Sequence, residues 1–442
     1  MIKNNVQRLF KQKMTWFVIG IISILSMYLI MDFNNQSKEY NDFYLNQTRE
    51  QISTINNDLT IVDIGIKSGN VGNRKIDVSN AIEYKNTLML LLESTQRKER
   101  AILENDWETY HNEQLFFDYW NVSNYIYDIN HERNSKVIEE STEIIDLQTE
   151  VKDKMNYPEL VFSSDGLTNV MKDFRYYYKT RLLYSYQLVE NEVFTQPVNR
   201  YTMNGSTFIY HFFAQFWFIL FVLHIALNSG ILDDKKNNHS NKGFIAQYIL
   251  SIGNTLIVVL IPLVLISIIL SLFKGASSLN LPVLVNSMSW KSFVGIENNL
   301  KYDFLGNGGN FAIGLSYFSS YPRGSGEMSA LLGFMPLMQF YGLTFILFLF
   351  NLGFISSIIL LINRIIKSKL FVTGITLIIC VLGVFLSQID PNAIFIKFNP
   401  YSGMNMILLN GGSSSITLLN SIIVLSISTI ILLGVNQYLD KQ

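Results

Sequence analysis

The chain contains little cysteine and little proline, with 1 Cys and 8 Pro among its 442 residues. The single cysteine, Cys380, lies inside an apolar run, so no intrachain disulfide can form. The long polar stretch at residues 32–205 has no cysteine at all. We therefore expect this stretch to be stabilised by a packed core and not by covalent cross-links.

Charge is also scarce, because Asp, Glu, Lys and Arg make up 16% of the residues while hydrophobic residues make up 49%. Runs of about 20 apolar residues can cross a hydrocarbon core of roughly 30 Å as helices. Proton-coupled carriers and intramembrane metalloproteases need ionisable groups at membrane depth, and no Asp, Glu, Lys or Arg lies in these runs, which argues against both classes. The sequence predicts an α-helical polytopic membrane protein with transmembrane helices at about residues 15–31, 206–228, 244–273, 333–362, 370–388 and 415–436.

The first apolar run, within residues 1–31, has a second interpretation as a cleavable signal peptide. The run is long for such a peptide, and the bulky, polar sequence Met31-Asp32-Phe33-Asn34 follows it in place of a small-residue cleavage pattern. We therefore interpret it as the first transmembrane helix. The residues before it have one apolar helical face, which predicts a helix on the inner membrane surface, or alternatively an ordinary basic flank; this face holds Ile2, Val6, Leu9 and Phe10.

Motifs for nucleotide binding and catalysis are missing as well. The chain has no Gly-x-x-x-x-Gly-Lys-Ser/Thr phosphate loop, no His-Glu-x-x-His, no Gly-x-Ser-x-Gly and no zinc-spaced cluster of Cys and His. We expect a protein that is not an enzyme and has no catalytic residue, bound cofactor or metal, so any ATP and Mg use must come from a partner ATPase. His211 and His224 share one run but lie about 140° apart around a helix, which predicts helix contacts and not a shared ion.

Lys and Arg flank the runs asymmetrically, and the positive-inside rule converts this asymmetry into an orientation. The loop at residues 389–414 holds only Lys397. The sequence thus predicts a bacterial cytoplasmic membrane protein with cytoplasmic amino and carboxyl termini and an extracellular domain at residues 32–205. The basic residues on the predicted inner side are Lys3, Arg8, Lys11, Lys13, Lys235, Lys236, Lys242, Arg364, Lys367 and Lys369.

Residues 32–205 are acidic, with 18 Lys+Arg and 28 Asp+Glu, a net charge of −10 against +9 for the rest of the chain. An acidic domain attracts cationic ligands and repels anionic ones, so we expect no nucleic acid partner. The alternative is that acidic faces only keep the domain soluble.

The same residues are predicted to form a mainly helical domain. Asn80-x-x-Glu83 resembles a capping box, and apolar residues from Ile82 to Ile102 approximate a helical stripe. Two short β-prone stretches between Leu59 and Val78, separated by Lys-Ser-Gly-Asn, predict a β-hairpin. Further helices are expected near residues 38–57, 107–119, 134–155 and 168–191.

The five later runs form a predicted transmembrane bundle at residues 206–442. Pro262 and Gly353 predict kinks, and the run at 333–362, about 45 Å long as a helix, has to tilt or break in a bilayer. Uncharged polar residues in such bundles more often hydrogen-bond to a neighbouring helix than bind substrate. Those expected to join helices are Asn228, Asn254, Gln339, Asn351 and Asn420.

Three local motifs carry a family resemblance. The loop after the second run reads Gly230-Ile-Leu-Asp-Asp-Lys-Lys and continues to Lys242-Gly243-Phe244, Phe398-Asn399-Pro400-Tyr401 precedes the last run, and the amino terminus is basic and amphipathic. Together with the topology, these motifs resemble the membrane subunits of type-2 ABC exporters, the ABC-2 permeases, including members with a large outer domain between the first two spans. The sequence departs from the family at Phe244, where Thr is common, and in its long loop at 274–332.

The resemblance implies a permease subunit that pairs with a cytoplasmic ABC ATPase and with a second copy of itself or a related permease. It also implies an ATPase-coupling loop and an outer gate loop. Aromatic residues of the second run are candidates to line the pathway, with lipid or helix packing as the alternative. The coupling residues are Asp233, Asp234, Lys235, Lys236 and Gly243, the gate residues are Asn399, Pro400 and Tyr401, and the lining residues are Phe212, Phe216 and Trp217.

The substrate is expected to be amphipathic, because a bundle without Asp, Glu, Lys or Arg suits such a cargo or a membrane lipid better than a small ion. The acidic outer domain suits a cationic peptide, so we expect export of a peptide or bacteriocin, with lipid or drug export as the alternative. A membrane-anchored receptor or immunity protein that binds a toxin without transport is a second class, and it would need no coupling loop. An intramembrane enzyme would cluster polar residues at one depth, and the sequence shows no such cluster.

Overall fold

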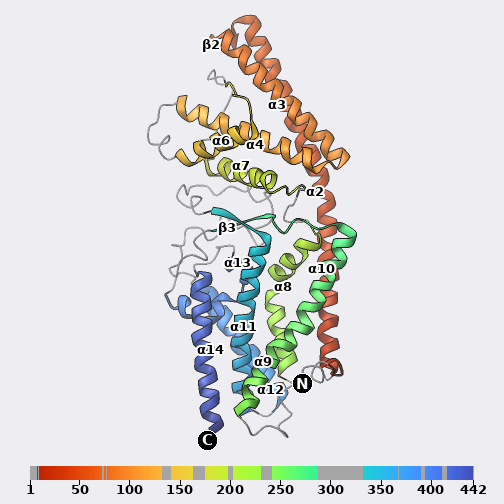
Figure 1. Cartoon of the computed structure of the whole chain (residues 1–442), viewed down its shortest axis with the longest axis vertical. Coiled ribbons are helices and arrows are strands. Elements are labelled where there is room, and N and C mark those ends of the chain that lie inside the picture. The colour runs from red at the N-terminus through yellow and green to blue at the C-terminus, as the bar shows by residue number, and fades with distance from the viewer. Residues whose placement is uncertain are drawn as a thin grey trace.

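The computed structural model describes twelve parts of the chain, and together they form an elongated, mostly helical molecule (Figure 1). Its lower part is a bundle of apolar helices, and its upper part is a second group of helices that we call the distal domain (residues 35–197). Both chain ends lie at the bottom of Figure 1, which we call the terminal end of the bundle. The described residues are 7, 9–71, 74–75, 77–131, 141–162, 175–197, 203–229, 241–286, 332–366, 368–389, 394–410 and 416–441.

The structure confirms six helices that are long and apolar enough to cross a membrane. They are Lys13–Asn34, Gly205–Asn228, Ile245–Lys274, Leu337–Ile365, Lys369–Ser387 and Leu418–Leu439.

The first of these helices is only the beginning of α2 (Lys13–Ser68), which runs unbroken for 56 residues from the terminal end to the far tip of the distal domain (Figure 1). The predicted helix at 38–57 is therefore a continuation of the first apolar helix. It ends at Gly69, whose positive φ of 72° lets its N–H reach the carbonyl of Gly65.

The predicted hairpin between Leu59 and Val78 is wrong for its first strand, because residues 59–66 belong to α2. Leu59, Val62 and Ile66 pack toward α3, a helical spacing that the short β-prone run concealed. Among the described residues that follow, β1 (Asn70–Val71) pairs antiparallel with β2 (Arg74–Lys75).

The distal domain continues with α3 (Val78–Glu104), which returns antiparallel along α2, and then α4 (Trp107–His131), α6 (Thr142–Met155) and α7 (Arg175–Glu190). The predicted capping box at Asn80 is wrong. The cap is Asp77, whose Oδ1 accepts the backbone N–H groups of Ser79 and Asn80 at 3.0 and 3.4 Å. The Asn80 side chain instead donates to the carbonyl of Phe162.

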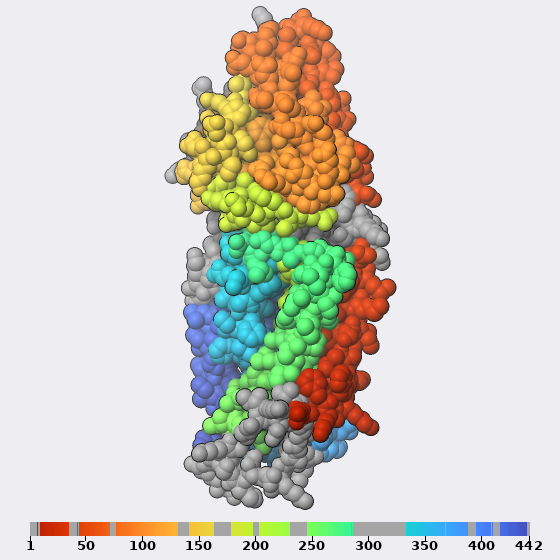
Figure 2. All heavy atoms as spheres, turned by 45° about the vertical axis from the view of Figure 1, so that its right-hand side comes forward, coloured from red at the N-terminus to blue at the C-terminus, as the bar shows by residue number. Residues whose placement is uncertain are grey.

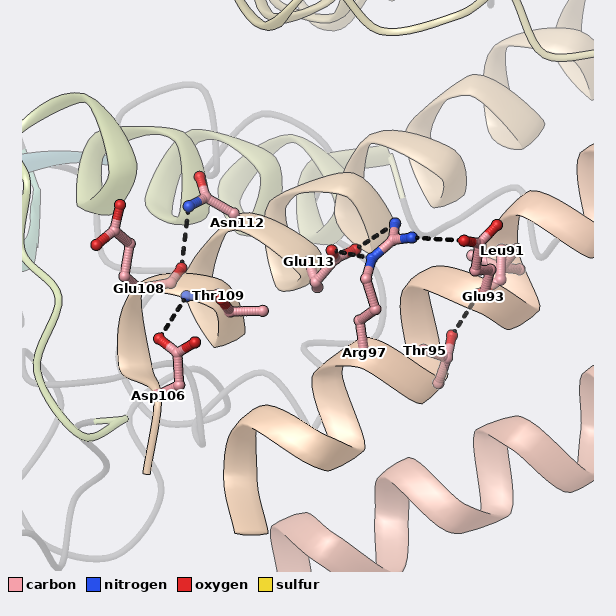
Figure 3. Close-up of polar contacts among 9 residues, drawn as sticks. All are labelled: Leu91, Glu93, Thr95, Arg97, Asp106, Glu108, Thr109, Asn112 and Glu113. Carbon is pink, nitrogen blue, oxygen red and sulfur yellow. Dashed lines mark hydrogen bonds and ion pairs between the residues drawn. The ribbon is translucent and has the colours of Figure 1, made fainter. Parts of the chain in front are cut away.

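Ion pairs tie the helices of the distal domain together. Arg97 of α3 bonds to Glu113 of α4 and to Glu93 of its own helix (Figure 3). Deeper inside, the Lys98 ammonium donates to Gln51 of α2 at 2.8 Å and to Gln114 of α4 at 3.3 Å.

The bundle consists of α8 (Gly205–Asn228), α9 (Asn241–Thr255), a π-helical turn at Leu256–Leu260, α10 (Ile261–Lys274), α11 (Leu337–Ile365), α12 (Lys369–Ile389) and α14 (Leu418–Lys441). Helix α11 is central, because 72% of its most apolar stretch is buried, against 22–28% for the apolar stretches of α2, α9–α10, α12 and α14. Short helices at Ile394–Phe398, Pro400–Gly403 and α13 (Met406–Asn410) separate α12 from α14.

The irregularities of the bundle helices do not lie at Pro262 and Gly353, where kinks were predicted. The irregularity near Pro262 is the π-helical turn just before it, and Pro262 occupies the first turn of α10. Helix α11 runs without a break through Gly353, which instead permits close approach to α9: an added Cβ would lie 2.5 Å from the Tyr248 hydroxyl. A kink that the sequence did not indicate occurs in α8 at Phe216, with φ −116° and ψ 16°.

The distal domain rests on the bundle through a two-stranded antiparallel ribbon of β3 (Pro282–Asn286) and β4 (Leu332–Pro336) (Figures 1 and 2). Tyr184 of α7 stacks against Phe334 of β4 with ring centroids 5.5 Å apart. Tyr184 and Leu188 belong to the same buried cluster as the bundle, so one continuous core joins the two parts.

Protonation of Lys98 makes the stability of the distal domain depend on pH. Burial lowers the pKa of Lys98 to about 7, although the Asp118 carboxylate favours the charged form. Because the unfolded lysine keeps its proton to a higher pH, stability rises as pH increases from about 7 toward 10.

We predict that the unfolding temperature of the full chain in detergent rises between pH 7 and pH 10 by several degrees more for the wild type than for Lys98→Met. Methionine keeps the length of the side chain but cannot titrate. Tryptophan fluorescence during heating measures this difference, and identical pH profiles for the two proteins would contradict the prediction.

Candidate functional site

A cluster of hydrogen-bonded side chains joins three helices of the bundle; we call it the His224 cluster (His224, Asn228, Ser251, Thr255 and Ser356). His224 is fully buried, and its ring nitrogens lie 2.6 Å from Thr255 Oγ1 and 3.0 Å from Ser356 Oγ. Asn228 Nδ2 donates to Thr255 Oγ1 at 3.0 Å, and the hydroxyls of Ser251 and Ser356 lie 3.0 Å apart. The expectation that Asn228 joins helices is therefore confirmed.

The spacing of polar residues in the sequence carries a signal for this cluster that goes beyond the single expectation for Asn228. His224 and Asn228 are four residues apart on α8, and Ser251 and Thr255 are four residues apart on α9, so each pair lies on one helical face. Two such pairs in neighbouring apolar helices can face each other and exchange hydrogen bonds, each worth about 0.6–2 kcal/mol in membranes.

The His224 cluster lies where α8 ends. Asn228 is the last residue of α8, whereas Ser251 is ten residues inside α9, so the first turns of α9 extend about 15 Å beyond α8. Gly243 lies in this extension, in the first turn of α9. The other predicted coupling residues, Asp233, Asp234, Lys235 and Lys236, lie outside the described residues.

Further polar contacts connect helices at the terminal end. Ser229 at the end of α8 shares a hydrogen bond with Thr373 of α12. Arg364 of α11 donates to the carbonyl of Asn436 in α14 at 2.6 Å, and Asn436 donates to the carbonyl of Ser357 at 3.3 Å. This end of the bundle is therefore held by side-chain hydrogen bonds as well as by apolar packing.

The predicted gate residues lie in the short-helix segment (Ile394–Asn410). Asn399 caps the helix at Pro400–Gly403: its Oδ1 accepts the N–H of Tyr401 at 3.0 Å, while its Nδ2 donates to the carbonyl of Gly383 in α12 at 3.0 Å. The ring of Tyr401 lies against Gly383, where an added Cβ would be 2.2 Å from Tyr401 Cδ2. Tyr401 also contacts Phe354 of α11 edge-to-face, with centroids 5.2 Å apart.

The short-helix segment reaches the middle of the bundle. Asn351, 14 residues from either end of α11, donates to the carbonyl of Gly403 at 3.3 Å. That depth is about 21 Å from the distal end of α11 at 1.5 Å per residue. We expected these residues in a loop across the outer end, whereas they enter the bundle. Irregular backbone is tolerated at such depth only where protein or a cavity surrounds it.

The three predicted lining residues pack against other aromatic rings. Phe212 is fully buried and lies 5.2 Å from Phe216, and Trp217 lies 6.5 Å from Phe221. These contacts are helix packing, the alternative that the sequence left open, and a role in lining a pathway stays a prediction.

The two histidines of α8 lie apart, as their spacing predicted. His211 packs on Phe33 of α2 with centroids 4.4 Å apart, away from the His224 cluster. Within the described ranges, no group of three or more His, Cys, Asp or Glu side chains is placed to hold a metal.

The other polar residues that were expected to join transmembrane helices differ in their solvent exposure. Gln339 is exposed, whereas Asn254, Asn351 and Asn420 are buried. Asn351 joins α11 to the short-helix segment, as expected of it.

No protein family model, no curated protein and no solved structure matches the chain.

We predict that Gly383→Val displaces the Tyr401 ring and lowers stability by about 1–3 kcal/mol, the usual cost of overpacking. Gly374→Val is the matched control, because Gly374 lies in the same helix and an added Cβ there meets nothing within 4 Å. Thermal unfolding of both purified variants measures the difference, and equal effects would contradict the packing described for Tyr401.

Proposed function

We propose that the chain is the transport subunit of an ATP-driven exporter and is driven by an ATPase at the terminal end of the bundle. The observation that carries this proposal is the His224 cluster, which binds α8, α9 and α11 together where α8 ends, a few residues before the predicted coupling residues in the sequence. The chain has no phosphate loop, so the energy must come from a partner. A partner that displaces the end of α8 would therefore move three bonded helices together.

Contacts farther along the helices support transmission of such a movement toward the distal domain. Gly205 at the start of α8 lies so close to α10 that an added Cβ would be 1.7 Å from Ser271 Oγ. The Ser267 hydroxyl donates to the Gly205 carbonyl, and Tyr341 of α11 donates to the carbonyl of Ser206. Helices α8 and α11 are thus bonded to α9 near the terminal end, and α8 is bonded to α10 and to α11 near the distal end.

The substrate that we propose is a peptide, a bacteriocin or another amphipathic molecule. The apolar helices carry polar amides and hydroxyls but no Asp, Glu, Lys or Arg in their interior stretches, and residues 32–205 are acidic. A lipid or drug is the alternative cargo. A second copy or a related permease would cover the exposed apolar faces that lipid does not cover.

A receptor or immunity protein without transport is the second candidate function. Exposed apolar side chains near the far end of the distal domain favour it, because a binding surface uses such groups. They include Ile61 and Ile64 of α2, at 41% and 59% exposure, and Ile82 of α3, at 46%.

Co-purification with the candidate ABC ATPase, followed by ATP hydrolysis with and without the subunit, tests the proposal. We expect stable association and a several-fold change in hydrolysis when the subunit is present. Failure to associate would exclude the transport function. The receptor alternative predicts instead that toxin binding survives deletion of residues 234–242.

We further predict that Asn228→Leu still associates with the ATPase but loses much of its effect on hydrolysis, because it removes one of the two α8 side chains that bond to Thr255 of α9. Ser387→Ala is the control, since the Ser387 hydroxyl bonds to a carbonyl of its own helix, Val384. If Asn228→Leu kept the full effect, the His224 cluster would have no part in coupling.

A further inference from the structure

Buried polar atoms without partners gather where α14 begins. Asn420 and Ser421 are 2% and 4% exposed, and neither the Asn420 amide nor the Ser421 hydroxyl has a hydrogen-bond partner among the described residues. The same holds for Oδ1 of Asn351, which is fully buried. Each such group costs about 1–3 kcal/mol when buried unpaired.

Two of the three side chains, those of Asn351 and Ser421, meet at Gly403 of the short-helix segment, and Asn420 is the neighbour of Ser421 in the sequence. The Gly403 carbonyl accepts from Asn351, and an added Cβ on Gly403 would lie 2.9 Å from Ser421 Oγ. Asn420 precedes Ser421 and shares the buried face of α14 with Val424, one turn farther along. The Asn420 amide is thus directed into the bundle and not toward lipid.

The first turn of α14 contributes further polar groups beside Gly403. Thr417 caps the helix: its Oγ1 accepts the N–H of Asn420 at 3.2 Å, and its carbonyl accepts the N–H of Ser421 at 3.0 Å. The backbone groups of Asn420 and Ser421 are therefore bonded while their side chains are not. A helix start carries partial positive charge, which favours an incoming carbonyl oxygen.

The surroundings restrict which group can bind. The neighbouring side chains Met404, Leu409 and Leu425 are buried and apolar, and a charged group would lose its hydration without gaining an opposite charge. An asparagine amide offers both a donor and an acceptor, and Ser421 adds another of each. A secondary amide, with one N–H and one C=O, is the uncharged group that matches this set.

We propose that Asn351, Asn420 and Ser421 form a binding site for a backbone amide of a peptide that enters the bundle beside Gly403. The proposal rests on the proposed function in one respect, because it takes the bound peptide to be the cargo of the transporter. Binding itself requires no ATPase, so the site can be tested separately from transport.

The test uses the full chain in lipid nanodiscs without ATPase and two dansyl-labelled hexapeptides of Leu and Ala. One probe has ordinary amides, and the other is N-methylated at every amide, which removes the donors but keeps the apolar side chains. Fluorescence titration measures both affinities. We expect the wild type to bind the ordinary peptide at least ten-fold more tightly, and Asn420→Leu to lose this preference.

Asn436→Leu is the matched control, because Asn436 is a buried asparagine near the other end of α14 whose Nδ2 bonds to Ser357. It should keep the ten-fold preference. Ser421→Ala, a smaller change, should reduce the preference several-fold and serves if Asn420→Leu does not fold. Equal binding of the two peptides by the wild type, no binding at all, or an unchanged preference in both Asn420→Leu and Ser421→Ala would overturn the proposal.

Thermal unfolding without peptide separates a binding site from a structural role. Asn420→Leu should unfold at a higher temperature than the wild type, because it removes an unpaired buried amide. A lower unfolding temperature would mean that Asn420 supports the fold, which would overturn the site. Peptide preference without ATPase association would leave the site standing and remove transport, whereas the reverse would remove only the site.

Discussion

Water is absent from a hydrocarbon core, so each polar group within the apolar helices has to find its partner inside the protein. This requirement explains the arrangement of the bundle around α11, the most buried helix. Ser356 of α11 shares a hydrogen bond with His224 of α8, and Asn351 of α11 bonds to the short-helix segment. The irregular backbone at Gly403 is tolerated because protein surrounds it on the sides of α11 and α14.

Polar groups find hydrogen-bond partners in the His224 cluster but not around Gly403. In the His224 cluster, polar groups of α8, α9 and α11 exchange hydrogen bonds, which hold the three helices in fixed positions relative to one another. Around Gly403, the side chains of Asn420 and Ser421 are buried but unpaired, which does not stabilise the fold shown here. Proteins retain such costs mainly where binding or movement uses them. The bundle thus has a firmly bonded part near its terminal end and a less satisfied part at mid-depth.

The apolar runs alone were sufficient to predict the six long helices, and helical spacing predicted α3, α4, α6 and α7 within the described residues. Local pattern failed where several structures fit it equally: residues 59–66 look β-prone, yet packing against Tyr84 and Leu88 of α3 makes them helical. Contacts between distant segments could not be predicted from spacing. Tyr401 meets Gly383 because two segments happen to cross, and only their final positions determine that contact.

Helix α2 connects the two ends of the molecule as a single stiff element. At 1.5 Å per residue its 56 residues span about 84 Å, and less than half of that length lies in its apolar stretch. A tilt of 10° about its lower end would therefore carry its far tip through about 15 Å. A rearrangement among the apolar helices that tilts α2 would therefore produce a larger displacement at the far tip of the distal domain than within the bundle.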